Sequence, residues 1–216
     1  VQAKMFSTLD VLTGGRVICG VGVGWLEKEF DILRVPYSER GALSDEYLGI
    51  FRCLWTEEYP VFDGRFFKIE GIRFYPKPVQ KPHLPIWVGG HSRAAIRRTV
   101  KYGDTWHPTR QTPRYVEAMI PYLRRYAEKN QRDPETIGIS LKRSLHFTDI
   151  GLPNPEARST GGAVVGGTAE IIEDILECQK IGINQLTYDF RSTGTEQCIQ
   201  MVEHFMNEVS PAVNTH

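Results

Sequence analysis

The stretch that decides the fold is Pro85-Ile86-Trp87-Val88-Gly89-Gly90-His91-Ser92. Its apolar run predicts a buried strand, and the glycine pair predicts a tight turn into a helix that begins near Arg93. A helix that starts at such a turn offers backbone N–H groups and the positive end of its dipole to an anion. A weaker copy lies at Val164-Val165-Gly166-Gly167-Thr168-Ala169-Glu170, where Thr168 is the expected N-cap. Two such turns indicate a phosphorylated ligand at one end of a parallel sheet.

Strands and helices alternate through most of the chain. A glycine-rich strand is expected over residues 16–24, followed by helices over 26–33 and from 38 or 40 to 55. Four more strands are expected over 86–88, 104–107, 137–147 and 185–190, interleaved with helices over 92–102, 113–130, 168–181 and 195–209. This order predicts an α/β barrel or an open α/β sheet.

Two segments depart from the alternation. Residues 1–12 predict a helix that buries Val1, Met5, Leu9 and Leu12, with Ala3 and Phe6 on the same side, and that ends at Gly14. Residues 59–82 predict an inserted antiparallel hairpin with strands over 61–68 and 72–75 and turns at Asp63-Gly64 and Glu70-Gly71. With no repeat or linker in the chain, we expect residues 1–216 to form one domain.

Composition excludes several classes of function. The 26 Lys and Arg residues equal the 26 Asp and Glu residues, so neither nucleic acid nor an anionic membrane is an expected partner. No apolar run approaches the roughly 20 residues of a membrane helix, and we expect a soluble cytoplasmic protein. The four cysteines are expected to be reduced packing residues. No HxH, HExxH or CxxC spacing is present, and no metal is expected.

Several motifs in order carry a family resemblance. They include Leu9-Asp10-Val11-Leu12-Thr13-Gly14-Gly15, Gly20-Val21-Gly22-Val23-Gly24-Trp25, Pro85-Ile86-Trp87-Val88-Gly89-Gly90 and Tyr102-Gly103-Asp104-Thr105-Trp106-His107-Pro108. The chain thereby resembles the luciferase-like monooxygenase superfamily, most closely its probable coenzyme F420-dependent oxidoreductase branch. The resemblance implies a (β/α)8 TIM barrel with a flavin or deazaflavin at the carboxyl ends of the strands. In that family the first helix here follows strand three, so this chain is expected to carry strands four to eight only, either as an N-terminally truncated chain or as one that another chain completes.

The resemblance also assigns site residues, each with a plainer alternative. Gly89, Gly90, His91 and Ser92 match the turn that holds the phosphate of FMN or the deazaflavin; the alternative is an ordinary strand-to-helix turn. Gly166, Gly167 and Thr168 are expected either to complete that anion site from the next unit or to form an ordinary turn before a helix.

Other candidates lie at or after the ends of strands. Trp25 is expected to flank the cofactor or to plug the barrel end, and Glu29, one helical turn later, is expected to orient a loop or ring substituent or to lie exposed on its helix. His107 transfers a proton or holds its loop by a hydrogen bond. Arg110 and Arg191 pair with a phosphate or polyglutamyl tail, or are ordinary surface residues.

The function that these residues indicate is hydride transfer between reduced coenzyme F420 and a small organic substrate, by a protein expected to form a homo-oligomer, a dimer. One alternative is an FMN-dependent two-component monooxygenase with a separate flavin reductase. Another is a non-catalytic flavin-binding or assembly barrel fragment.

Overall fold

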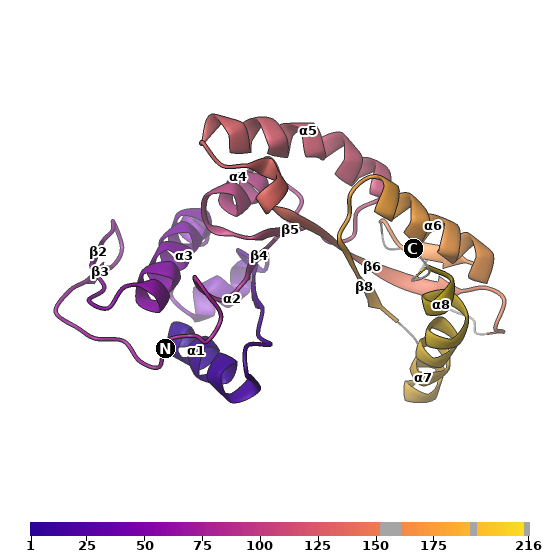
Figure 1. Ribbon diagram of the computed structural model, residues 1–216, viewed down its shortest axis with the longest axis horizontal. Coiled ribbons are helices and arrows are strands. Elements are labelled where there is room, and N and C mark those ends of the chain that lie inside the picture. Colours follow the sequence, from indigo (N-terminus) through magenta and orange to yellow (C-terminus); the bar gives the residue numbers. More distant parts are fainter. Residues whose placement is uncertain (152–160, 191–193, 214–216) are drawn as a thin grey trace. The chain divides into compact units, whose positions relative to one another are not determined.

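A computed structural model describes residues 1–151, 161–190 and 194–213, which form an α/β fold with parallel strands (Figure 1). The strands are β1 Cys19–Val21, β2 Phe62–Asp63, β3 Lys68–Ile69, β4 Ile86–Gly89, β5 Thr105–His107, β6 Gly138–Phe147, β7 Val164–Gly166 and β8 Gln185–Asp189. The α-helices are α1 Gln2–Thr13, α2 Glu27–Ile32, α3 Arg40–Thr56, α4 Arg93–Tyr102, α5 Pro113–Lys129, α6 Thr168–Lys180, α7 Thr195–His204 and α8 Ser210–Val213. Within the described ranges, no helix is both long and apolar enough to span a membrane.

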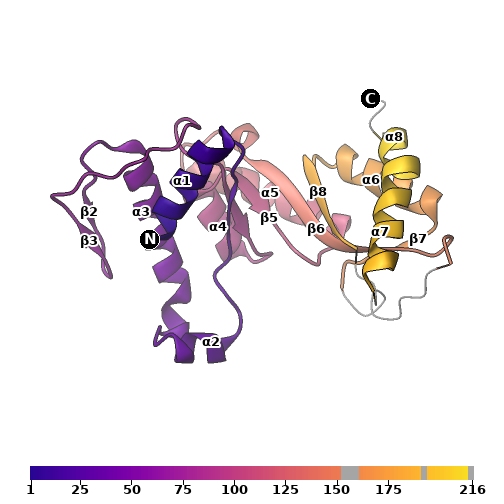
Figure 2. The same ribbon diagram turned by 90° about the horizontal axis from the view of Figure 1, so that it is seen from below.

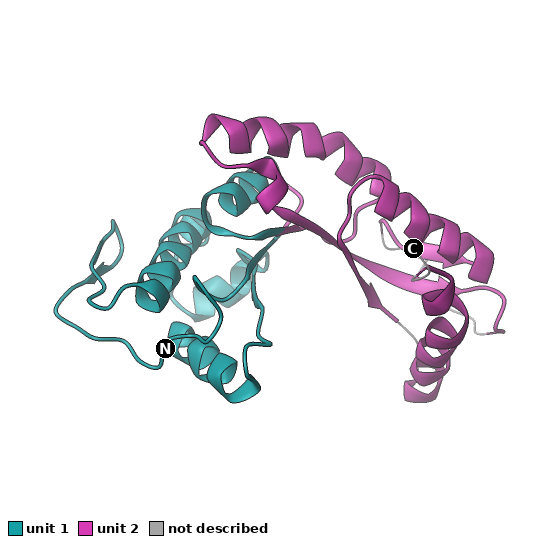
Figure 3. Ribbon diagram, viewed as in Figure 1, with its two compact units in different colours: residues 1–89, 93–105 teal, residues 90–92, 106–216 magenta. Residues whose placement is uncertain are grey.

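The chain divides into two compact units (Figure 3). Unit 1 holds residues 1–89 and 93–105, and unit 2 holds residues 90–92 and 106–216. The single domain inferred from the sequence stays a prediction.

The core of unit 1 forms between a parallel strand pair and helices α1 and α3. Cys19 of β1 is in register with Ile86 of β4, and both side chains are fully buried. The buried indole of Trp55 on α3 donates a hydrogen bond to the Ala3 carbonyl on α1 over 3.0 Å. This bond joins the two helices on the side that faces the strands.

Unit 2 is organised around the long strand β6. Its residues 140–144 pair with β8 and its residues 145–147 pair with β7, both in parallel. Leu145 and Phe147 are fully buried in a cluster with Ile171 of α6 and Met201 of α7. Figure 2 shows these helices beside β6 and β8. One face of the strands is therefore covered by helices.

The parallel α/β class is confirmed, and several boundaries are corrected. The strand expected over 16–24 shortens to Cys19–Val21, and β7 adds a short strand that the sequence analysis missed. The helix expected over 195–209 is α7, followed by a π-helical segment, Phe205–Val209, and by α8.

The hairpin closes earlier than predicted. Its strands are β2 and β3, which pair Phe62 with Ile69, and residues 72–75 form no strand. The Gly64 N–H donates to the Phe67 carbonyl over 2.9 Å. The Glu46 carboxylate accepts hydrogen bonds from the backbone N–H groups of residues 65–67. A carboxylate on α3 therefore holds the turn that begins at the predicted Asp63-Gly64 signal, within the range expected as the strand 61–68.

The buried face of α1 differs from the predicted one. The helix ends at Gly14 as expected, with Gly14 at φ 65°. However, Met5 and Leu12 are 65% and 78% exposed, while Ser7 and Asp10 are fully buried. Of the predicted apolar residues, Ala3 is buried and Phe6 packs against the core. Asp10 accepts hydrogen bonds from the backbone N–H groups of Val79 and Gln80, so polar contacts on the same side also orient this helix.

Candidate functional site

The glycine turn after β4 has the geometry that the sequence predicts. Gly89 ends β4, where a Cβ atom would lie 3.3 Å from the Val21 carbonyl oxygen. Gly90 has φ 119°, a conformation that favours glycine. Its N–H donates to the His107 carbonyl and its own carbonyl accepts from the Trp106 indole over 2.8 Å. These bonds hold the turn at the end of its strand.

His91 and Ser92 lead from this turn into α4. Both side chains are exposed, and Ser92 immediately precedes the first helical residue, Arg93. The His91 carbonyl accepts a hydrogen bond from the Tyr115 hydroxyl over 2.7 Å. The first turn of α4 contains no acidic residue, and Arg93 and Arg97 are exposed on the helix. An exposed hydroxyl, a helix amino terminus and neighbouring arginines fit a phosphate group.

The second turn does not fit an open anion site. Gly167 is the N-cap of α6, and Thr168, the expected N-cap, is its first helical residue. The Asp149 carboxylate accepts hydrogen bonds from both the Thr168 N–H and the Thr168 hydroxyl, at 2.7 and 2.8 Å. Glu170 accepts from the Gly167 N–H over 2.7 Å. The chain's own carboxylates therefore occupy the donors that a phosphate would need.

Asp149 is electrostatically suited to that position. Burial raises the pKa of its carboxyl, but the two Thr168 hydrogen bonds and the charge of His204 outweigh this effect and leave the pKa below its ordinary value. The Thr168 hydroxyl also contacts His204 Nε2 at 2.7 Å. Sequence reasoning missed both Asp149 and His204, because they lie 19 and 36 residues from Thr168.

His107 lies at the end of β5 and contacts β6. Its Nδ1 is 2.9 Å from the hydroxyl of Ser140, a fully buried residue that the sequence analysis did not select. Burial, and then the positive charge of Lys142, lower the pKa of His107 below its ordinary value. The imidazole is therefore neutral at pH 7 and has one nitrogen that accepts a proton.

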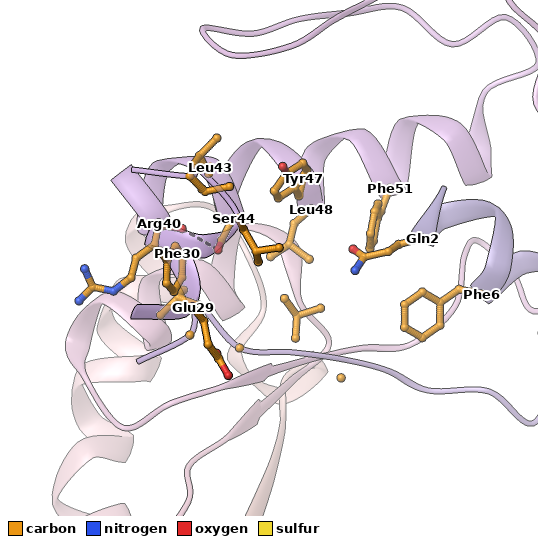
Figure 4. Close-up of a pocket in the computed structure, with 17 residues that line it drawn as sticks. Gln2, Phe6, Glu29, Phe30, Arg40, Leu43, Ser44, Tyr47, Leu48 and Phe51 are labelled. Atoms are coloured by element: carbon orange, nitrogen blue, oxygen red, sulfur yellow. Dashed lines mark hydrogen bonds between the residues drawn. The ribbon is translucent and has the colours of Figure 1, made fainter. Parts of the chain in front are cut away.

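A cavity of about 590 Å³ lies within unit 1, between the β1–α2 loop and helices α1 to α3 (Figure 4). Phe6, Phe51 and Tyr47 supply aromatic lining, and Glu29 adds a carboxylate. Trp25, expected to flank the cofactor, is 81% exposed and does not line this cavity.

The two candidate arginines have different outcomes. Arg110 is exposed, has φ 57°, and donates its backbone N–H to the Lys142 carbonyl over 2.9 Å. Arg191 lies outside the described residues.

Each of the four cysteines lies in the described part of the chain. All four cysteines are free thiols; Cys19, Cys53 and Cys178 are buried and Cys198 is half-buried. Among the described residues, no cluster of three or more His, Cys, Asp or Glu side chains is placed to hold a metal ion.

The sequence of this chain matches a protein-family model and is similar to several curated proteins. The model of the family described as luciferase-like monooxygenase matches residues 1–151. An FMNH2-dependent dimethylsulfone monooxygenase of Pseudomonas putida is 31% identical over 131 residues, which are 59% of this chain and 36% of that protein. An uncharacterised protein of Mycobacterium tuberculosis is 35% identical over 166 residues, 76% of this chain and 56% of that protein. The matches thus span from about a third to just over half the length of these relatives.

Solved structures share the fold. An F420-dependent secondary alcohol dehydrogenase, solved with an F420–acetone adduct, superposes with a TM-score of 0.81 at 19% identity, over 99% of this chain and 74% of that one. A monooxygenase from Streptomyces bottropensis superposes with a TM-score of 0.80 at 21% identity, over 97% of this chain and 73% of that one. With the family model matching most of the chain, these likenesses lead to one assignment: the chain belongs to the luciferase-like monooxygenase family.

Proposed function

We propose that this protein is an oxidoreductase that transfers hydride between reduced coenzyme F420 and a small organic substrate. The turn at residues 89–92 is the observation that carries the proposal. It joins Gly90, whose φ of 119° favours glycine, to an exposed serine and a helix whose first turn lacks acidic residues. Such a turn suits the phosphate of a flavin or deazaflavin.

Different residues would bind the cofactor and transfer the proton. Ser92 and the first turn of α4 would hold the cofactor phosphate by a hydroxyl and backbone N–H groups. When bound, the deazaflavin would supply hydride to a carbonyl substrate in its reduced form, or accept hydride from an alcohol in its oxidised form. His107, neutral because its pKa is lowered, would accept the hydroxyl proton of an alcohol substrate. In the direction of carbonyl reduction, its protonated form would give a proton to the carbonyl oxygen. Its contact with Ser140 orients the ring for that role.

A second candidate is an FMN-dependent two-component monooxygenase. The Pseudomonas putida relative, which is FMNH2-dependent, favours it. That activity would require a flavin reductase as partner. A non-catalytic flavin-binding or assembly role is the third candidate, and we propose a cytoplasmic homodimer in each case.

Equilibrium titration with each cofactor, followed by fluorescence, tests the proposal. We expect tighter binding of F420 than of FMN, and no oxygen consumption when a flavin reductase and its reductant are added. Tighter FMN binding with reductase-dependent oxygen consumption would favour the monooxygenase. Binding of neither cofactor would overturn both enzyme candidates.

Two variants test the assigned turn. Ser92→Ala should weaken cofactor binding at least tenfold, about 1.4 kcal/mol. Ser38→Ala, at another exposed serine, is the matched control and should leave binding unchanged. Equal affinity in the two variants would remove Ser92 from the site.

A further inference from the structure

Strand β6 has two faces of different chemistry. Side chains alternate along a strand, so Leu141, Arg143, Leu145 and Phe147 share the face covered by helices. Ser140, Lys142, Ser144 and His146 share the opposite face. Lys142 is the exposed residue of the strand, with buried residues on either side of it. An ammonium group in the middle of a parallel strand departs from the apolar pattern of such strands.

Of the two adjacent cations on β6, Arg143 is paired with a carboxylate, and among the described residues Lys142 is not. The Arg143 guanidinium is buried, forms an ion pair with Asp174 of α6 and donates to the Gly162 carbonyl over 2.6 Å. In contrast, within the described part of the chain the Lys142 ammonium has no ion pair or hydrogen bond with a carboxylate. Arg143 thus has a structural role, whereas no carboxylate of the described residues pairs with the Lys142 ammonium.

Strand register places hydroxyl groups on both sides of Lys142. Lys142 forms a parallel bridge with Thr109 and pairs with Thr187 of β8. Residues in register on parallel strands project from the same face, so the Lys142 side chain leaves its strand between two threonine side chains. His107 precedes Thr109 by two residues, and Ser140 precedes Lys142 by two residues. Both therefore lie on this same face.

We propose that Lys142, Thr109 and Thr187 form an anion subsite that binds the carboxylate, sulfonate or phosphate group of the substrate. One ammonium and two hydroxyl donors suit an oxyanion, which accepts several hydrogen bonds at once. Assigning the anion to the substrate rests on the proposed function, because it places the acidic group beside the proposed proton-transfer residue His107. Two residues along a strand span about 7 Å, so the substrate would be an organic acid with its reacting oxygen a few carbons from the acidic group.

The electrostatic effect of Lys142 on His107 makes the pKa of His107 a measure of anion binding. The charge of Lys142 is one cause, after burial, of the lowered pKa of His107. A bound anion neutralises that charge and should raise the pKa of His107. On β6 and β8, the other titratable side chains of this face are His146 and Asp189, whose contributions are common to all variants below.

Sulfate is the probe, because it remains a dianion across the titration range of histidine. The His107 ring signals are followed by NMR in the full chain, with chloride added to hold ionic strength constant, and are assigned by comparison with His107→Gln. In the wild type, sulfate should raise the pKa of His107. Lys142→Gln should raise that pKa without sulfate, abolish the response to sulfate and weaken sulfate binding at least tenfold.

Control variants separate charge at this position from charge in general. Lys142→Arg should retain sulfate binding, and Lys129→Gln, which removes an exposed lysine from α5, should behave as the wild type. Equal sulfate binding by wild type and Lys142→Gln would overturn the subsite, as would the absence of sulfate binding to the wild type.

A cofactor titration identifies the source of the anion. If the subsite serves the substrate, Lys142→Gln leaves F420 and FMN affinity unchanged; a tenfold loss of cofactor affinity would overturn that assignment. Failure of the wild type to bind either cofactor, with the sulfate response intact, would overturn the proposed function while supporting the anion site.

Discussion

Replacing Asp149 with alanine tests whether this carboxylate caps α6. The change removes two short hydrogen bonds, from the N–H and the hydroxyl of Thr168. Loss of an N-cap acceptor costs about 1 kcal/mol. Loss of a negative charge at a helix amino terminus costs a further ~0.3–1 kcal/mol, with the lower end expected for this solvent-screened side chain. We therefore expect the free energy of unfolding to fall by about 1–2 kcal/mol.

Urea denaturation followed by circular dichroism measures this difference. Asp149→Asn keeps an acceptor oxygen and should recover part of the loss, and Thr168→Val should lose the hydroxyl bond alone. Asp133→Ala is the control, because Asp133 caps only the short 3-10 helix Pro134–Thr136. A free energy of unfolding for Asp149→Ala within 0.3 kcal/mol of the wild type, on the order of the error of additivity, would refute the capping argument.

The same residue predicts a pH dependence. The folded-state pKa of Asp149 lies below its ordinary value, so its stabilising contribution is present above the unfolded-state pKa. That contribution is lost as the pH falls through the folded-state pKa. The stability curves of the wild type and Asp149→Ala should therefore converge in acid. Curves that stay parallel down to the acid limit would contradict the assigned hydrogen bonds.

Three further outcomes are expected. Asp10→Ala leaves the N–H groups of Val79 and Gln80 without their acceptor and should reduce the free energy of unfolding by about 2–4 kcal/mol, against little change for the exposed Asp63→Ala. Because the folded-state pKa of His107 is lowered, the wild type should lose stability as pH falls below the ordinary histidine value; His107→Asn should reduce this slope, and an unchanged slope would assign it to another group. Thiol labelling of the native protein should modify Cys198 before Cys19, since burial raises the pKa of Cys19 to about 12; mass mapping that finds Cys19 modified first would contradict this order.

Local signals in the sequence determined the element types and the position of the first glycine turn. Alternating apolar runs and amphipathic segments predicted strands β4, β5, β6 and β8 and the helices between them. Gly14 and the Gly89-Gly90 pair marked their turns because glycine readily adopts positive φ, observed at 65° for Gly14 and 119° for Gly90. These features depend on residues within a few positions of one another, which a single sequence contains.

Only the tertiary structure decided which groups meet. Met5 and Leu12 of α1 were expected to be buried, yet the side with Ala3 and Asp10 lies inward, where Asp10 accepts hydrogen bonds from residues 79 and 80. Thr168 was expected to cap α6, yet Asp149 reaches that end from the segment after β6. The contact between His107 and Ser140 and the placing of Lys142 between two threonines depend on strand register. Register and long-range hydrogen bonds are set by the packing of the whole unit, because the partner groups lie tens of residues apart and no local pattern links them.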